Sequence, residues 1–544
     1  MAPYLDTSAP SSPKDNSPPL PSFKEAFPHF YKDPNTLPHS FDPFTVNAVT
    51  GFLPTALPIK DLPATFSAVQ KLVEVMPVQK LDGAPGLLGT YTFGEAIDSG
   101  EALLDLTEHI DELRVAGTGK LDLHVITALF RDYSFLASGY LLEPCWKTWN
   151  ERRAGGVIPD GSASSYSAPG PAEYGYGRSK LPSCIARPLV KLAEILAIPP
   201  FMSYAASYAL YNYYLEDPAL GHEMYDDIRL VRAFEKGLDP ASSEAGFILT
   251  HVHMVSLTGP LIKGVIEVMD GVGMLAKSGV TDKTKQVSKI EEALSLILAQ
   301  MSKIEANMER MWANSRPKDY TTYRTFIFGI TSQPLFPDGV VYEGCFGDKP
   351  VDFRGESGAN DSIIPLLDNL CQVPMPKNPL TDILREFREY RPESQRSLLN
   401  WTECKANILN TRSFLTTTSP RLAILYLRVL NHIRSFRWRH WMFVREYIIK
   451  RTKYPVATGG SPIVTWLPNQ LSAVMELMEG VYRDSGLMAL VEEGMFHGGG
   501  GEELEEGVSG TEKKVVKEIM EVVEEQKARL EKEVRKYCME RCLK

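Results

Sequence analysis

The chain has 544 residues, of which 44% are hydrophobic and 23% charged, and it carries a formal net charge of −10 with a pI near 5.6. This length exceeds that of one ordinary domain and the composition is typical of globular proteins, so we expect more than one folded unit and a large core. The acidic balance argues against a nucleic-acid partner, which would need clustered Lys and Arg.

The sequence predicts neither secretion nor a membrane span. The N-terminus, MAPYLDTSAPSSPKDNSPPLP, lacks the apolar core and the basic flank of a signal peptide. The most apolar long stretch, residues 189–214, is interrupted by Lys191, Glu194 and two prolines. Seven cysteines at scattered spacings favour reduced thiols over a disulfide framework. We therefore expect a cytoplasmic protein.

Composition and periodicity predict four segments and a mainly α fold. Residues 1–40 are rich in Pro and Ser, and we expect a disordered leader. Residues 41–238 alternate helical patterns with loops, including a low-complexity stretch at 155–177, and predict a mixed, mostly helical N-terminal segment. Residues 239–495 predict a mainly α-helical domain. Its helical runs are 245–275, 284–312, 358–371, 379–391 and 415–450.

The last segment, residues 496–544, combines a Gly-rich linker with a highly charged helix. Val516, Ile519, Val523 and Leu530 give this helix an apolar seam. A helix laid on the same molecule is the favoured interpretation, and a docking site for a partner is the alternative. The P-loop, Rossmann, GxSxG, HExxH and CxxC patterns are absent from the sequence, which removes the commonest nucleotide, hydrolase and zinc functions.

His440 lies on a predicted helix whose apolar stripe includes Phe436, Phe443 and Tyr447, so its imidazole should face an apolar interior. By periodicity alone, a hydrogen-bonded core histidine is the favoured interpretation. A neutral imidazole in an apolar site is also what a five-coordinate haem requires. Arg437, one turn earlier, is equally consistent with pairing to a buried anion and with a surface position.

His251 shares a predicted helical face with Phe247 and Val255. His253 faces elsewhere, so these two histidines do not form a metal pair. Two small-residue loops, 353–362 and 454–462, could approach a flat ligand or move, but each is a weak signal by itself.

Taken together and in order, seven segments resemble the indoleamine 2,3-dioxygenase family, and most closely its fungal branch. The resemblance is strong over residues 180–465, weaker over 40–180, and reaches neither tail. The segments are LPSCIARPLVKLAEILAIPPFMSYAASYALYNY, GFILTHVHMV, YRTFIFG, DGVVYEG, FRGESGANDSIIPLLD, IRSFRWRHWMFVREYI and ATGGSP.

The resemblance implies a small N-terminal domain that caps a large all-helical domain, with haem b held between them. His440 matches the proximal iron ligand, and Arg437 matches the arginine that holds a haem propionate. Asp368 matches a carboxylate in the same polar network, where the two charges would neutralise each other. Ser357 and Gly358 match the backbone turn beside the haem.

On the distal side, the resemblance implies an indole pocket, a carboxylate-binding residue and a mobile loop. Arg324 matches the arginine that binds the substrate carboxylate, and Thr458 with Ser461 matches the loop that contacts the ammonium group. His251 stands where mammalian members have serine, and we expect it to accept a hydrogen bond from the indole N–H or to tune bound oxygen. The residues matching the pocket wall are Tyr204, Ser207, Tyr208, Phe247, Ile248 and Ile327.

The implied activity is addition of both atoms of O2 across the indole C2–C3 bond of L-tryptophan by a monomer with ferrous haem, giving N-formylkynurenine. This reaction would open the kynurenine pathway towards NAD biosynthesis. Two alternatives stay open: a haem-binding sensor or scaffold with little activity, and a dioxygenase for another indole. Arg324 argues against the sensor, which needs no carboxylate clamp. Glu356 departs from the family pattern, because a glycine can stand there.

Overall fold

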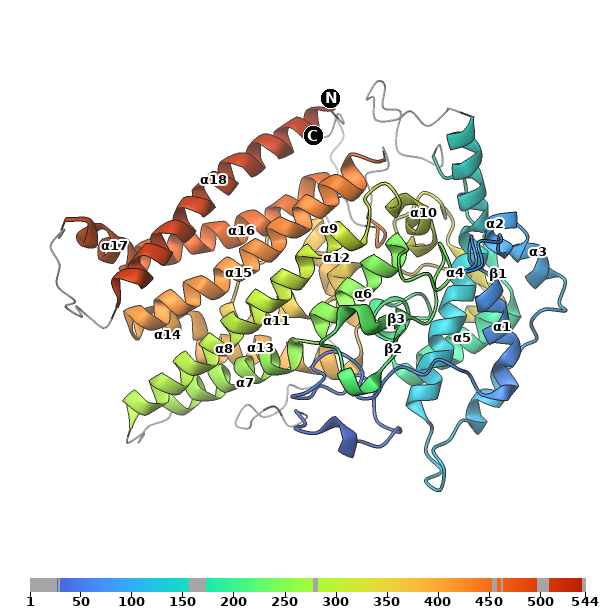
Figure 1. Cartoon of the computed structure of the whole chain (residues 1–544), viewed down its shortest axis with the longest axis horizontal. Helices are drawn as coiled ribbons and strands as arrows, with labels where there is room; N and C mark the ends of the chain where they lie inside the picture. Colours follow the sequence, from blue (N-terminus) through green and yellow to red (C-terminus); the bar gives the residue numbers. More distant parts are fainter. Residues whose placement is uncertain are drawn as a thin grey trace, which may run out of the picture.

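Long helices with buried faces build most of the chain. The computed structural model describes residue 27 and residues 30–155, 173–276, 282–452, 457–460, 463–496 and 508–540. The long helices α7, α8, α15, α16 and α18 pack side by side in one half of the molecule, and α1 to α5 lie at the other end (Figure 1). The prediction of a mainly α fold is confirmed.

The described residues form the following α-helices: α1 (Ser67–Val75), α2 (Leu87–Thr90), α3 (Phe93–Asp98), α4 (Leu123–Ala154), α5 (Ser183–Leu196), α6 (Ser243–Val255), α7 (Thr258–Leu275), α8 (Lys283–Glu309), α9 (Met311–Asn314), α10 (Tyr320–Arg324), α11 (Ile363–Cys371), α12 (Pro379–Glu386), α13 (Glu393–Leu409), α14 (Thr411–Thr417), α15 (Pro420–Val444), α16 (Ile463–Asp484), α17 (Leu487–Phe496) and α18 (Gly510–Glu540). The strands are β1 (Lys180–Leu181), β2 (Tyr213–Leu215), β3 (Ile228–Leu230), β4 (Val340–Tyr342) and β5 (Pro350–Val351). Two short π-helices span Tyr204–Tyr208 and Arg445–Ile449.

Local sequence explains where the key helices begin and end. The Ser419 hydroxyl accepts a hydrogen bond from the Leu422 N–H, and Pro420 occupies the first helical position, so α15 starts at that proline. The run predicted at 245–275 is two helices, because Pro260 has no N–H to donate and its ring crowds the preceding turn. Helix α6 therefore ends at Val255, and α7 starts at Thr258.

Two small sheets connect segments that are distant in sequence. β1 pairs in parallel with β4, with Lys180 opposite Val341, and β4 pairs antiparallel with β5. β2 and β3 form an antiparallel pair. β4 and β5 lie in the half that was expected to be wholly helical. One hydrophobic core includes residues from both sides of position 238, so a domain boundary there stays a prediction.

The predicted leader is shorter than residues 1–40. Tyr31 pairs with Asn47 through a β-bridge, and the ring of His39 lies 4.4 Å from that of His124 at the start of α4. Residues 30–40 are therefore ordered, because their rings and backbone find partners in the folded chain, and the predicted disorder is wrong for them. Residues 1–26 and 28–29, and most of the low-complexity stretch at 155–177, lie outside the described residues.

The stretch Ser243–Leu275, which comprises α6 and α7, is long and apolar enough to cross a membrane by length and composition. Most of it is buried inside the fold, with 72% of its most apolar window covered. One such stretch is weak grounds for a membrane span, because a core helix passes the same test.

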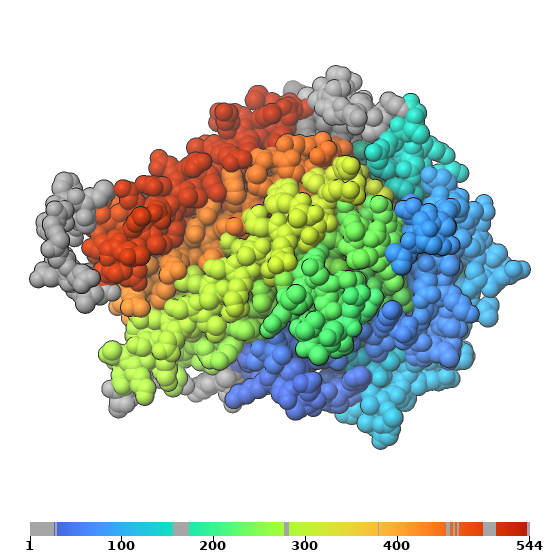
Figure 2. Space-filling model, viewed as in Figure 1, coloured from blue at the N-terminus to red at the C-terminus, as the bar shows by residue number. Residues whose placement is uncertain are grey.

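The charged C-terminal helix α18 lies along α15 and α16 on the same molecule (Figures 1 and 2). The seam predicted from the sequence, at Val516, Ile519, Val523 and Leu530, is buried. Glu533 accepts hydrogen bonds from the Trp441 indole N–H at 2.8 Å and from Arg445 at 2.7 Å. Helix α18 thus supports the outer face of α15, the helix that carries His440 and Arg437.

Replacing Glu533 with alanine leaves a buried indole N–H and a mostly buried guanidinium without their acceptor. We expect Glu533→Ala to lower the free energy of unfolding by about 1–3 kcal/mol, measured by urea denaturation. The control is Glu525→Ala, on the exposed side of the same helix, which should change it by less than about 0.5 kcal/mol. Equal values for the two variants would contradict the supporting role of Glu533.

Candidate functional site

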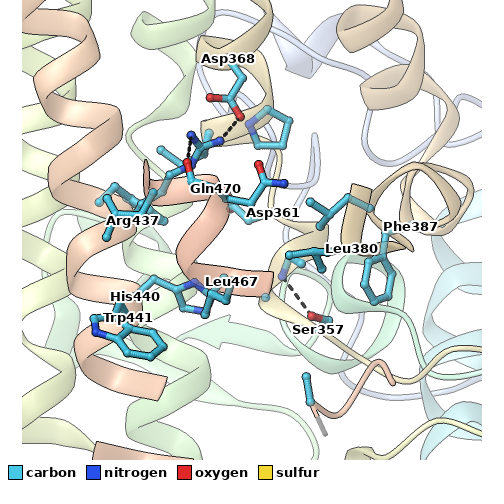
Figure 3. A pocket seen from close by; sticks show the side chains of 18 of the residues that line it. Ser357, Asp361, Asp368, Leu380, Phe387, Arg437, His440, Trp441, Leu467 and Gln470 are labelled. Carbon is cyan, nitrogen blue, oxygen red and sulfur yellow. Dashed lines mark hydrogen bonds and ion pairs between the residues drawn. The ribbon is translucent and has the colours of Figure 1, made fainter. Parts of the chain in front are cut away.

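A cavity of about 540 Å³ lies among segments that are far apart in the sequence: α6, α10, the loop 356–361, α11 to α13, α15, residues 457–458 and α16. Its volume is in the range of cofactor and small-molecule sites. Figure 3 shows α15 on one side of the cavity, with Ser357 and Phe387 on the other. Much of the wall is apolar, including Phe247, Ile364, Leu380, Phe387, Phe436 and Phe443.

His440 lines this cavity from α15, as its helical stripe predicted. Phe436, Phe443 and Val444 line the same wall one turn to either side of it. Burial, together with the smaller effect of the His251 imidazole, lowers the pKa of His440 to about 4. Because the ring is neutral at physiological pH, a nitrogen lone pair is available to a metal ion.

Arg437 forms the polar end of the cavity together with Asp368 and Gln470. Its guanidinium donates to the Asp368 carboxylate at 2.6 Å and to the Gln470 carbonyl at 3.0 Å (Figure 3). The second carboxylate oxygen of Asp368 and both side-chain amide atoms of Gln470 are buried without a hydrogen-bond partner among the described residues. Buried polar atoms are normally satisfied, so this end of the cavity suits a ligand with polar groups.

His251 enters the cavity from α6. Its Nδ1 lies 2.8 Å from the Phe247 carbonyl oxygen, which can only accept, so Nδ1 carries the proton and Nε2 keeps its lone pair. Burial lowers the pKa of His251, so the ring stays neutral. A Cβ atom placed on Gly358 would lie 3.8 Å from Nε2, which shows that this acceptor is next to the loop 356–361.

The loop from Arg354 to Asp361 is held in place from several sides. Arg391 donates to the carbonyl oxygens of residues 359, 360 and 361 at 2.9 to 3.1 Å. Arg354 donates to Glu386 and to the Gly459 carbonyl. At Gly355 the chain packs against Gly329 so closely that a Cβ atom would lie 2.2 Å from the Gly329 nitrogen. The loop backbone is therefore fixed before any ligand binds.

Glu356 places a carboxyl group in the cavity wall, and its side chain is almost fully buried. Its own carbonyl oxygen accepts a hydrogen bond from the Thr458 hydroxyl at 2.7 Å. Burial raises the pKa of Glu356 to about 8. The sequence marked Glu356 only as a departure near this loop, because periodicity does not reveal the burial of a loop residue.

Of the distal residues expected at the site, His251, Phe247 and Thr458 line the cavity, whereas Ser461 lies outside the described residues. The others are fully buried behind the wall. Their polar groups have partners there: the Tyr204 hydroxyl donates to Asp361, and that of Tyr208 donates to Glu244. Their contacts with a substrate stay predictions. The residues behind the wall are Tyr204, Ser207, Tyr208, Ile248, Arg324 and Ile327.

Ser357 and Gly358 line the cavity, as does Asp368. The sequence did not point to Asp361, Arg391, Phe387 or Gln470, which also line it. Asp361, Phe387 and Arg391 fall in the runs 358–371 and 379–391 that were predicted as helices, but they lie in or beside short 3₁₀ turns, so the helical period does not show which way they face. Gln470 lies on α16, a helix that the periodicity did not single out.

The residues present fit a haem group. Flat apolar walls suit a macrocycle, His440 offers a neutral imidazole, and Arg437 with the unpartnered atoms of Asp368 and Gln470 suits its carboxylate side groups. His440 would be the protein ligand to the iron, and Arg437 would hold a propionate.

A comparison with known families matches the family model "Indoleamine 2,3-dioxygenase" over residues 40–462. The chain belongs to this family. Relatives include indoleamine 2,3-dioxygenase 1 of Rattus norvegicus, 28% identical over 51% of this chain and 64% of the relative. Indoleamine 2,3-dioxygenase of Saccharomyces cerevisiae is 28% identical over 51% of this chain and 60% of the relative. A protein named myoglobin, from Haliotis diversicolor, is 26% identical over 50% of this chain and 66% of the relative. The chain thus spans about two thirds or less of the length of these curated relatives.

In this indoleamine 2,3-dioxygenase family member, the two glycines of the loop should respond differently to a methyl group. We expect Gly355→Ala to lower the free energy of unfolding by about 1–3 kcal/mol, because backbone atoms must move. Gly358→Ala should cost less than about 0.5 kcal/mol, because its methyl meets only an ordinary contact with His251. Urea denaturation measures both, and equal losses would contradict the packing described.

Glu356 should also make stability depend on pH. Its pKa rises from 4.5 to about 8 on folding, so its contribution is fully present below pH 4.5 and is lost as pH rises through about 8. Between about pH 5 and pH 8, we expect the free energy of unfolding of the haem-free protein, measured by urea denaturation, to fall by on the order of 2–4 kcal/mol. The Glu356→Gln variant should not show this fall. The exposed control Glu389→Gln should retain the wild-type profile. Parallel profiles for wild type and Glu356→Gln would contradict the burial.

Proposed function

We propose that the chain is a haem-dependent dioxygenase that inserts both atoms of O2 across the indole C2–C3 bond of L-tryptophan, giving N-formylkynurenine. The observation that carries the proposal is the composition of the cavity wall. Helix α15 contributes His440 and Arg437, which is paired with Asp368 of α11, and α6 contributes the hydrogen-bond acceptor His251. Family membership supports the same reaction type. Under this proposal the enzyme acts as a cytoplasmic monomer and supplies the kynurenine pathway and NAD biosynthesis.

When bound, ferrous haem would supply the oxygen chemistry, and the protein would supply binding and positioning. His440 would hold the iron on one side and leave the other coordination position open. Arg437 would neutralise a propionate, while Asp368 and Gln470 would complete the hydrogen bonds around it. The apolar wall would exclude water from the reacting atoms.

On the substrate side, His251 is placed to accept a hydrogen bond from the indole N–H through Nε2, which would fix the orientation of the ring. Phe247, 4.8 Å from the His251 ring, adds an aromatic surface for the indole. Arg324 would bind the substrate carboxylate. It is fully buried near Tyr320, a wall residue whose pKa burial raises to about 12 although the Arg324 guanidinium opposes that rise.

A second candidate is a haem protein that binds oxygen with little dioxygenase activity. The relative named myoglobin favours keeping this candidate. The two candidates differ in product, because the second would show a haem spectrum without turning over L-tryptophan.

His440→Ala tests the iron ligand. We expect the variant to lose the haem absorption bands and N-formylkynurenine formation, because no other imidazole of α15 lines the cavity among the described residues. The matched control is His432→Ala on the same helix, where His432 contacts Glu305 instead. A His440→Ala protein with wild-type haem content and turnover would contradict the assignment. Wild-type protein with haem but no product from L-tryptophan would favour the second candidate.

A further inference from the structure

The carboxyl group of Glu356 differs from the other acidic groups that line the cavity. Asp361 accepts a hydrogen bond from a backbone N–H at 2.8 Å and one from a tyrosine at 3.3 Å. Asp368 and Glu403 each pair with an arginine, at 2.6 and 2.7 Å. Glu356 is 2% exposed, and no donor among the described residues reaches its carboxyl group. It is the lining carboxyl whose partner must come from outside the described chain.

The side-chain donors of Thr458, Arg354 and Arg391, which hold the loop, are already engaged elsewhere. The Thr458 hydroxyl donates to the main-chain carbonyl of Glu356 and not to its carboxyl group. Arg354 is used by Glu386 and Gly459, and Arg391 by the carbonyl oxygens of the loop. These contacts fix the backbone of Glu356 and leave its side chain facing the cavity.

Three tyrosines lie within electrostatic reach of the Glu356 carboxyl group, and the neutral imidazole of His251 lines the same cavity. Glu356 raises the pKa of Tyr204, Tyr208 and Tyr320, so all three lie within its electrostatic reach. The hydroxyls of Tyr204 and Tyr208 donate to other carboxylates. Burial raises the pKa of the tyrosines and lowers that of His251, so none of these groups carries a charge near pH 7.

Ionising a buried carboxyl group that has no donors is costly, and a neighbouring cationic ligand offsets that cost. An ammonium group brings a positive charge and three N–H donors to one point. Because the loop is fixed beforehand, little conformational freedom is lost when the pair forms. An α-amino acid ligand has such a group, whereas an indole acid without an amine does not.

We propose that Glu356 binds the α-ammonium group of the substrate and so makes this chain selective for indole ligands with a free amino group. The inference rests on the proposed function, because it names the residue that binds the amino group of the indole amino acid in the same cavity. Glu356 is then a specificity-determining residue, and Thr458 positions it through the hydrogen bond to its carbonyl.

Proton release follows from this role. The pKa of about 8 keeps Glu356 protonated at neutral pH without ligand, and a neighbouring ammonium stabilises the ionised form. The binding of an ammonium ligand at pH 7 should therefore transfer the Glu356 proton to solvent. Asp361, by contrast, already accepts hydrogen bonds from Tyr204 and from the Ile363 N–H, and Arg391 lies close to it.

The test compares two ligands on haem-loaded wild type, Glu356→Gln and the surface control Glu389→Gln. L-Tryptophan and indole-3-propionate differ by the amino group, and their dissociation constants are measured from the change in the ferric haem spectrum. We expect Glu356→Gln to weaken L-tryptophan binding about 10- to 100-fold, the loss typical of a hydrogen bond to a charged group. Indole-3-propionate should bind within about threefold of wild type, and Glu389→Gln should change neither.

Calorimetry in buffers of different ionisation enthalpy gives a second readout. L-Tryptophan should release protons from wild type at pH 7 and none from Glu356→Gln. Equal weakening of both ligands, unchanged binding of L-tryptophan, or a wild type that does not prefer L-tryptophan to indole-3-propionate would overturn the proposal. A preference that depends on Glu356 in a protein that forms no N-formylkynurenine would support the ammonium site and overturn the proposed reaction instead.

Discussion

Helix α15 has to present a neutral imidazole and a cation to the same cavity while remaining packed in the core on its other sides. Two features of the fold make this possible. Asp368 from α11 and the Gln470 carbonyl from α16 take the charge of Arg437, and burial keeps His440 neutral. On the outer side of α15, Glu533 of α18 accepts hydrogen bonds from the side chains of Trp441 and Arg445. The cavity depends on this helix, because it contributes both His440 and Arg437 to the lining.

The cavity has two polar regions of different character, separated by apolar wall. At Arg437 the charges are paired, with a few unsatisfied atoms that suit the carboxylates of a cofactor. The carboxyl group of Glu356 has no hydrogen-bond donor among the described residues, and His251 in the same cavity can only accept at its free nitrogen. A cofactor with anionic groups suits the first region, and a ligand with N–H donors suits the second. Under the proposals made above, the cofactor would occupy the first region and the substrate the second.

The sequence predicted the helical elements well where periodicity was long, and predicted poorly what loops do. The stripe around His440 and the seam of α18 were recognisable because burial repeats with the helical period. The break between α6 and α7 at Ser256 was not predicted, because it depends on the effect of Pro260 on a single helical turn. Arg391 and Gln470 could not be found, because their roles depend on carbonyl groups and side chains brought together only by the tertiary fold. The sequence identified Glu356 as a departure from the family pattern, but it could not predict that no described donor reaches its carboxyl group.

The central claim is that His440 would be the protein ligand to the haem iron and that His251 would leave the iron free. Resonance Raman spectroscopy of the anaerobic ferrous protein tests it directly. The account predicts a five-coordinate iron with one iron–histidine stretching band, absent from His440→Gly and restored by added imidazole. A six-coordinate spectrum with two histidine ligands, converted to five-coordinate by His251→Ala, would contradict it.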